Sequence, residues 1–120
     1  MIKNICIVED NAGIREILSY ILEDENFDVK MCGTVKEFNA HLKKALPDVV
    51  VLDIMLTDGS GIALCKQMKS TPATSHIPVL LMSAHSRPEE VMELSGADAF
   101  ISKPFDIDEF KDTVTSYLHK

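Results

Sequence analysis

The chain has 120 residues, 46% of them hydrophobic and 26% charged, with a formal net charge of −7. This length fits one domain that can bury a core without disulfide bonds, and the composition is that of an ordinary globular protein. The acidic charge argues against direct binding to nucleic acid, which requires a basic surface, and no apolar stretch approaches the length that crosses a membrane. These properties favour a metal ion or another protein as the binding partner.

A strand over residues 5–8 and a helix after it are the first predicted elements. Residues 5–8 are apolar without interruption, which is typical of a strand buried on both faces of a parallel sheet, and Glu9 and Asp10 follow directly. Apolar residues then recur at the spacing of one helix face: Ile14, Ile17, Leu18, Ile21 and Leu22. We expect all five to pack in the core.

Residues 27–46 predict an edge strand and a second helix. Residues 27–31 alternate between apolar and polar, which suits a strand with one less covered face. Thr34 and Glu37 have the spacing of a capping box, and Pro47 stops the helix that they begin. The inward stripe of this helix is Val35, Phe38 and Leu42.

Residues 49–52 form a second uninterrupted apolar run, and Asp53 closes it. Residues 57–61 contain two glycines and mark a turn directly after this strand. We expect a helix from this turn to about Ser70. Its predicted inward residues are Ile62, Cys65 and Met68.

Two further strands are predicted to end in polar residues. Residues 79–82 end at Ser83, and residues 99–102 end at Lys103 and Pro104. The sequence therefore adds a hydroxyl and an ammonium to the ends of the predicted strands.

Two more capping boxes predict the remaining helices. Ser86 with Glu89 begins a short helix that ends before Gly96, and Asp106 with Glu109 begins the last helix. The predicted inward residues of the last helix are Ile107, Phe110, Val114, Tyr117 and Leu118.

Strand-like runs alternate with helix-like segments five times, which predicts an α/β fold with a mostly parallel sheet and helices on both sides. Because the carboxyl ends of parallel strands lie along one edge, we expect three carboxylates, one hydroxyl and one ammonium to converge there: Glu9, Asp10, Asp53, Ser83 and Lys103. Close carboxylates repel each other unless a cation lies among them or one acid holds a proton. Acids for a hard cation, an ammonium for an anion and a hydroxyl donor are the groups needed to form and hold an acyl phosphate.

Four motifs in the chain resemble those of the receiver domains of two-component response regulators. They are Glu9-Asp10 after the first strand, Asp53 within residues 52–56, Ser83-Ala84, and Lys103-Pro104-Phe105. Each motif alone is common, but four in the right order on predicted strand ends are specific. The resemblance covers the whole chain and implies a flavodoxin-like, doubly wound, five-stranded parallel sheet of order 2-1-3-4-5, with helices on both faces. It implies one receiver domain over residues 1–120, with no output domain in this chain.

The same resemblance implies the chemistry of the site. Asp53 is the implied acceptor of a phosphoryl group from a sensor histidine kinase or a histidine phosphotransfer protein. The implied ligands of Mg²⁺ are Glu9, Asp10, Asp53 and the backbone carbonyl of Met55. Lys103 is expected to pair with Asp53 and then with the phosphoryl oxygens, and the peptide bond before Pro104 is expected to be cis.

The resemblance also implies a switch. Ser83 would hydrogen-bond the phosphoryl group and move inward, which opens space that Phe100 fills. The helix before Gly96, the strand over residues 99–102 and the last helix form the implied face for a downstream protein effector or a homodimer. Such a domain assists its own phosphorylation and dephosphorylation and is not otherwise an enzyme.

Three positions near the site are less typical of the family. Met55 and His85 are implied to flank the mouth of the site, and solvent is the simplest environment for His85. Thr57 stands where many family members have proline, so we expect this loop to be less rigid.

Other functions fit the sequence less well. A degenerate receiver would act as a docking module without phosphorylation, but the intact acidic residues and Lys103 favour the phosphorylated switch. An aspartyl-phosphate phosphatase of the haloacid dehalogenase type would need a second aspartate where this chain has Met55. A flavodoxin would need a phosphate-binding loop where residues 9–11 would repel phosphate.

The cysteines and the N-terminal residues predict the compartment. Cys6, Cys32 and Cys65 are odd in number and lie among apolar neighbours, which indicates free thiols in a reducing environment. The N-terminal residues lack the features of a signal peptide. We therefore expect a cytoplasmic location.

Overall fold

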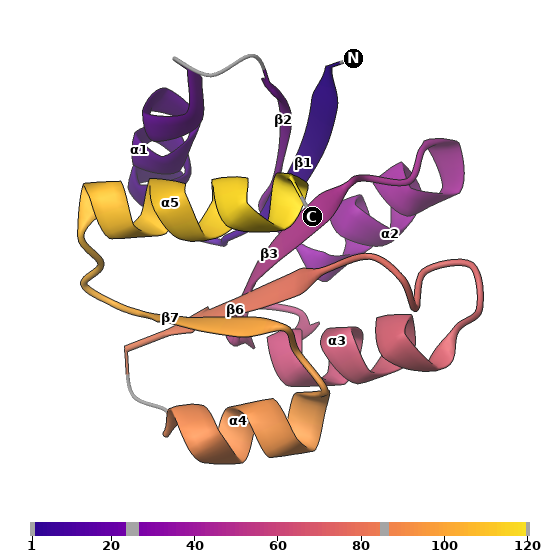
Figure 1. Cartoon of the computed structure of the whole chain (residues 1–120). Coiled ribbons are helices and arrows are strands. Elements are labelled where there is room, and N and C mark those ends of the chain that lie inside the picture. Colours follow the sequence, from indigo (N-terminus) through magenta and orange to yellow (C-terminus); the bar gives the residue numbers. More distant parts are fainter. Residues whose placement is uncertain (1, 24–26, 85–86, 120) are drawn as a thin grey trace.

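The computed structural model describes residues 2–23, 27–84 and 87–119, and a five-stranded parallel sheet lies at its centre (Figure 1). The strands of this sheet are β1 (Lys3–Val8), β2 (Phe27–Cys32), β3 (Val49–Asp53), β6 (Val79–Ser83) and β7 (Ala99–Ser102). Their order is β2-β1-β3-β6-β7, which confirms the predicted order 2-1-3-4-5 because β6 and β7 are the fourth and fifth strands of the sheet. A separate antiparallel hairpin is formed by β4 (Met55–Leu56) and β5 (Gly59–Ser60).

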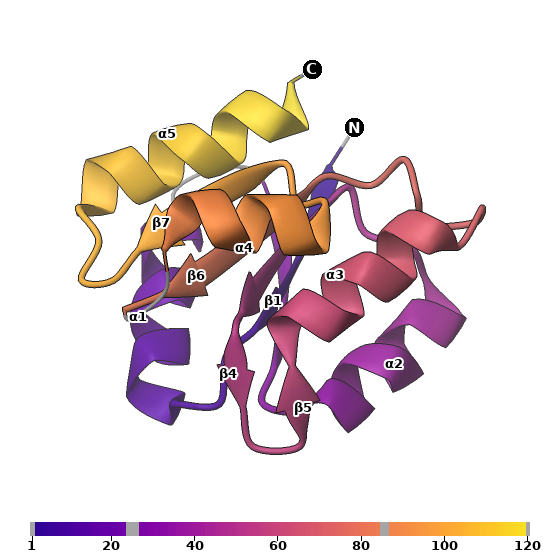
Figure 2. The same ribbon diagram turned by 90° about the horizontal axis from the view of Figure 1, so that it is seen from below.

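Helices cover both faces of the sheet, as predicted. They are α1 (Ala12–Glu23), α2 (Val35–Lys44), α3 (Gly61–Ser70), α4 (Pro88–Ser95) and α5 (Ile107–Leu118). Helices α1 and α5 cover one face of the sheet, and α2, α3 and α4 cover the other (Figures 1 and 2). Among the residues that the structure describes, no helix is both long enough and apolar enough to span a membrane.

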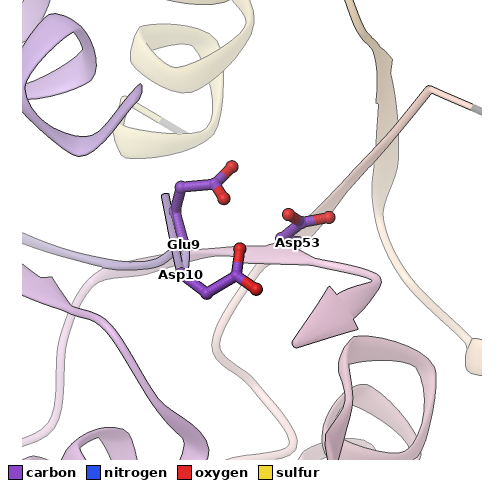
Figure 3. Close-up of side chains that lie close together, drawn as sticks. All are labelled: Glu9, Asp10 and Asp53. Carbon is purple, nitrogen blue, oxygen red and sulfur yellow. The ribbon is translucent and has the colours of Figure 1, made fainter. Parts of the chain in front are cut away.

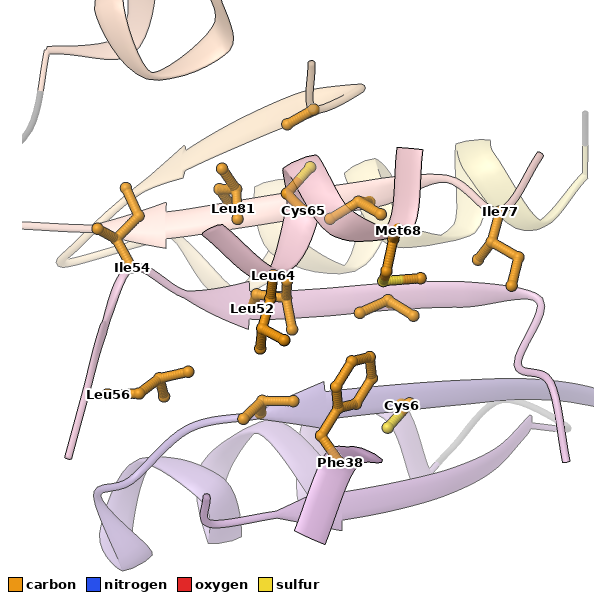
Figure 4. Close-up of a cluster of buried hydrophobic side chains, with 14 of the residues drawn as sticks. Cys6, Phe38, Leu52, Ile54, Leu56, Leu64, Cys65, Met68, Ile77 and Leu81 are labelled. Carbon is orange, nitrogen blue, oxygen red and sulfur yellow. The ribbon is translucent and has the colours of Figure 1, made fainter. Parts of the chain in front are cut away.

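Alternate residues of the central strands fill two separate cores. Ile5 and Ile7 of β1 pack under α1 and α5, whereas Cys6 and Val8 pack toward α2 and α3, where Phe38 fills the centre (Figure 4). A strand that is apolar at every residue therefore contributes to both cores, which is the physical reason for its uninterrupted pattern. The edge strand β2 alternates between half-buried and exposed residues, as its sequence predicts.

Most predicted helix starts are confirmed by cap hydrogen bonds. The Thr34 hydroxyl accepts a hydrogen bond from the Glu37 amide at 3.1 Å, and the Asp106 carboxylate accepts one from the Glu109 amide at 3.0 Å. The helix α4 begins at Pro88 with Arg87 in the cap position, which agrees with the preference of proline for the first turn of a helix, and the predicted cap residue Ser86 lies outside the described residues.

Two residues predicted to be buried are exposed. Ile17 is 53% exposed because it lies about 100° around the helix from Leu18, at the margin of the buried stripe. Ile107 is 56% exposed because it is the first residue of α5 and precedes the part of that helix that packs on the sheet. The three cysteines, Cys6, Cys32 and Cys65, are buried free thiols, as expected.

Candidate functional site

The carboxyl ends of four strands bring the predicted site residues to one edge of the sheet. Glu9 and Asp10 follow β1, Asp53 is the last residue of β3, Ser83 is the last residue of β6, and Lys103 follows β7. The parallel register aligns these ends: Val8 lies opposite Leu52, Asp53 opposite Met82, and Ser83 opposite Ser102. The convergence that the sequence predicted is therefore a direct result of strand register.

Three carboxylates meet at this edge. One oxygen from each of Glu9, Asp10 and Asp53 lies within 4.8 Å of the other two (Figure 3). Glu9 is only 1% exposed and Asp53 7%, whereas Asp10 is exposed and opens the cluster to solvent. Hard oxygen donors at this spacing suit a cation such as Mg²⁺, and a bound cation would offset the repulsion among the three acids.

Lys103 joins two of the three acids. Its ammonium donates hydrogen bonds to Asp53 Oδ2 at 3.0 Å and to Glu9 Oε1. Burial alone would lower the pKa of Lys103, but the hydrogen bonds to Glu9 and Asp53 outweigh burial and raise that pKa above its ordinary value. Burial also raises the pKa of Glu9, and the hydrogen bond from Lys103 offsets this only in part. The predicted Lys103–Asp53 pair is present, and the Lys103–Glu9 pair was not predicted.

The backbone around Glu9 is fixed on both sides. The Glu9 amide donates to the Cys32 carbonyl at 3.0 Å, and its carbonyl accepts a hydrogen bond of 2.7 Å from the Arg15 guanidinium. Its side chain also accepts from the Asn11 amide at 3.2 Å. Arg15 therefore supports the site from α1, and no pattern in the sequence pointed to it.

Asp53 is held by neighbouring backbone groups. The Met55 amide donates to Asp53 Oδ1 at 3.3 Å, and the Ile54 amide donates to the Met82 carbonyl at 3.0 Å. A Cβ atom on Gly61 would lie only 2.3 Å from the Asp53 carbonyl oxygen, so only glycine permits α3 to start this close to the strand. The Asp53 side chain therefore occupies a tightly defined position.

The predicted switch residues lie on adjacent strands. Ser83 is buried, and its carbonyl accepts a hydrogen bond of 3.0 Å from the Lys103 amide. Ser83 lies opposite Ser102 of β7, and Phe100 comes two residues before Ser102. The Phe100 side chain packs against the core on the α4 side of the sheet. The peptide bond between Lys103 and Pro104 is cis, as predicted. His85 lies outside the described residues.

A shallow apolar depression of about 400 Å³ borders the site. Its lining is formed by Ile14, Ile17, Ala84, Lys103, Pro104, Phe105 and Ile107. The two isoleucines that are unexpectedly exposed, Ile17 and Ile107, therefore lie on one surface beside Lys103. Exposed apolar side chains gathered at a site are typical of a protein contact.

Alkaline pH should weaken the Lys103 contribution to stability. A lysine whose pKa is higher in the folded than in the unfolded protein stabilises the fold fully below the ordinary value of 10.5, and this contribution is lost as the pH rises past the folded value. We expect the difference in melting temperature between the wild type and Lys103→Met to shrink above pH 10.5. Melting curves between pH 8 and pH 11.5, about one unit past that value, would measure it. A constant difference would contradict this prediction.

Comparison with known proteins identifies the family of the chain. A sequence profile of the response regulator receiver domain matches residues 5–115. The chain belongs to the response regulator receiver domain family. As a receiver domain of this kind, it is a module of two-component signalling systems.

Individual relatives show the same relationship. The receiver domain is 33% identical to the phosphate regulon transcriptional regulatory protein PhoB of Rhizobium meliloti (strain 1021) over 100% of the chain and 54% of that protein, so it spans about half the length of this relative. The solved receiver domain of a DNA-binding response regulator from Colwellia psychrerythraea 34H superimposes with a TM-score of 0.90 at 27% identity, covering 98% of this chain and 99% of the other. The beryllofluoride-activated DrrB receiver domain has a TM-score of 0.86 at 30% identity, with 100% of both chains covered.

Proposed function

We propose that this receiver domain is a phosphorylation-dependent switch whose acceptor is Asp53. The observation that carries the proposal is the contact of Lys103 with an aspartate that also belongs to a cluster of three acids. A partly buried lysine beside a carboxylate can balance the negative charge that a phosphoryl group brings. The phosphoryl donor would be a phosphohistidine on a sensor histidine kinase or a histidine phosphotransfer protein.

The Asp53 carboxylate would attack phosphorus of the phosphohistidine while the bond from phosphorus to the imidazole nitrogen breaks. A carboxylate nucleophile carries no proton that a general base would have to remove. Lys103 already contacts Asp53 Oδ2 and would also pair with the phosphoryl oxygens as their charge develops. The Ser83 hydroxyl would donate a hydrogen bond to the same group. In this view the domain promotes its own phosphorylation and dephosphorylation and has no further enzymatic activity.

Glu9, Asp10, Asp53 and the Met55 carbonyl are the groups that would hold Mg²⁺. When bound, Mg²⁺ supplies positive charge that offsets repulsion between the acids and the incoming phosphoryl group. Because Asp10 is exposed, a cation could reach the cluster from solvent. Glu9 would supply a ligand oxygen from a buried position, where it also accepts a hydrogen bond from Lys103.

Phosphorylation would change the partner surface of the domain. Ser83 would move toward the phosphoryl group and Phe100 would turn inward, which alters the face formed by α4, β7 and α5. A downstream effector protein, or a second copy of this domain as a homodimer, would read that face. The apolar depression beside Lys103 would contact the donor protein. The domain would work in the cytoplasm, where the reducing environment keeps thiols such as that of Cys6 free.

Incubation with acetyl phosphate and Mg²⁺, followed by intact-protein mass measurement, tests the proposal. We expect a gain of one phosphoryl mass that is absent when a chelator removes the metal. In a separate sample of the unmodified protein, beryllofluoride with Mg²⁺ should shift the amide resonances of β7 and α5. If neither reagent alters the protein, the domain is a docking module without phosphorylation, and the proposal fails.

A further inference from the structure

The hairpin that carries Met55 is too short to be stable alone. It has two residue pairs, Met55 with Ser60 and Leu56 with Gly59, and an isolated two-stranded hairpin is at best marginally stable in water. Met55 lies directly beside the site, because its amide donates to the Asp53 carboxylate. The Ile54 amide and the buried Leu56 side chain fix the residues on either side of Met55, and the position of the Met55 carbonyl depends in addition on what holds the tip of the hairpin.

Asp58, at the hairpin tip, binds the N-terminus of α2. Its Oδ1 accepts a hydrogen bond of 2.8 Å from the Val35 amide, and its Oδ2 accepts one of 3.2 Å from the Lys36 amide. These are two of the amides that a helix leaves without a partner in its first turn, and the helix dipole favours a negative charge there. The hydrogen bond from Val35, followed by that from Lys36, lowers the pKa of Asp58, so the carboxylate is charged at neutral pH.

The hairpin also packs closely on α2 beside this carboxylate. A Cβ atom on Gly59 would lie 2.9 Å from the Val35 side chain, so the absence of a side chain at Gly59 permits the approach. Thr34 already caps the same helix by accepting from the Glu37 amide. Asp58 thus adds a second, long-range anchor, 23 residues away from Val35 in sequence, at a helix end that is already capped.

We propose that Asp58 is a positioning residue that fixes the β4–β5 hairpin to α2 and so holds the Met55 carbonyl in place for the cation at the acidic cluster. This inference rests on the proposed function, because it assumes that the cluster binds Mg²⁺. Asp58 itself contacts backbone amides of α2 and acts on the site only through the hairpin.

Mg²⁺ titrations of the full chain, followed at the Met55 amide resonance, test this role in the wild type, Asp58→Ala, Asp58→Asn and Thr34→Ala. We expect Asp58→Ala to raise the Mg²⁺ concentration for half-saturation about tenfold. The rate of phosphorylation by acetyl phosphate at saturating Mg²⁺ should stay within about twofold of the wild type, since the nucleophile is untouched. Asp58→Asn should show a smaller increase, because one amide oxygen can still accept from Val35.

Thr34→Ala is the matched control, because it removes the other cap of the same helix without touching the hairpin. We expect its half-saturation to equal that of the wild type. An unchanged value for Asp58→Ala, an equal increase in Thr34→Ala, or an equal increase in both Asp58 variants would overturn the positioning role. Failure of the proposed function is recognised separately, in the wild type: Mg²⁺ binding without phosphorylation refutes phosphorylation but leaves the Asp58 test valid.

Discussion

Asp53→Asn is expected to abolish the gain of phosphoryl mass from acetyl phosphate and Mg²⁺ completely. The amide nitrogen and oxygen keep the size of the side chain, and the oxygen can still accept from the Met55 amide. However, an amide is not a nucleophile at neutral pH, so no acyl phosphate can form. The substitution also removes one of three mutually repelling acids, and we expect the free energy of unfolding to change by no more than about 1 kcal/mol.

Asp10→Asn is the matched variant for this experiment. Asp10 belongs to the same acidic cluster but does not contact Lys103 in the structure, so its replacement should weaken Mg²⁺ binding without removing the acceptor. We therefore expect phosphorylation of Asp10→Asn to recover at high Mg²⁺, whereas Asp53→Asn stays unmodified at every concentration. Phosphoryl gain in Asp53→Asn would place the acceptor elsewhere and refute the assignment. Intact mass spectra over a Mg²⁺ series, with urea denaturation of each variant, would provide the measurements.

The α/β fold class and the meeting of the site residues could be predicted because both follow from local sequence patterns, whereas the strand order was implied by the resemblance to receiver domains. Short uninterrupted apolar runs are typical of strands with both faces covered, so residues 5–8 and 49–52 indicated central strands of a parallel sheet. Parallel strands must end at the same edge, which brought Glu9 and Asp53 together without any knowledge of distances. The cap pairs, such as Thr34 with Glu37, were equally local and were found in the structure.

The interactions that could not be predicted join residues far apart in sequence. Lys103 and Glu9 are 94 residues apart, and nothing in either segment indicates that the ammonium reaches both acids. Asp58 looks like an ordinary turn residue until α2 is placed beside the hairpin. The exposure of Ile17 was also missed, because helical periodicity gives the direction of a side chain but not the width of the surface that covers it. These features depend on how elements pack, which a single sequence does not specify.

Lys103→Met is expected to destabilise the fold by about 2–4 kcal/mol at pH 8, because it leaves a buried acid without its partner. The Lys103 side chain is 16% exposed and that of Glu9 only 1%, so water cannot replace the lost ammonium at Glu9. Replacing both partners by uncharged groups of similar shape costs much less than breaking the pair. The double variant Glu9→Gln/Lys103→Met should therefore lie within about 1 kcal/mol of the wild type. Urea denaturation of the two single variants and the double variant would give the cycle.

The pH dependence of this cycle identifies the cause of the loss. In Lys103→Met the pKa of Glu9 loses the ammonium that lowers it, so burial raises that pKa further above the value in the unfolded chain. A carboxyl with a raised folded pKa stabilises the folded state when protonated, and this contribution is lost as the pH rises through the folded pKa. The loss of unfolding free energy in Lys103→Met should consequently be smaller near pH 5 than at about pH 8. Both pH values lie above the ordinary pKa of a glutamate, which is about 4.3. A deficit that does not change with pH, or that persists in the double variant, would assign the loss to packing of the lysine side chain or to its pair with Asp53, and not to the unpaired charge of Glu9.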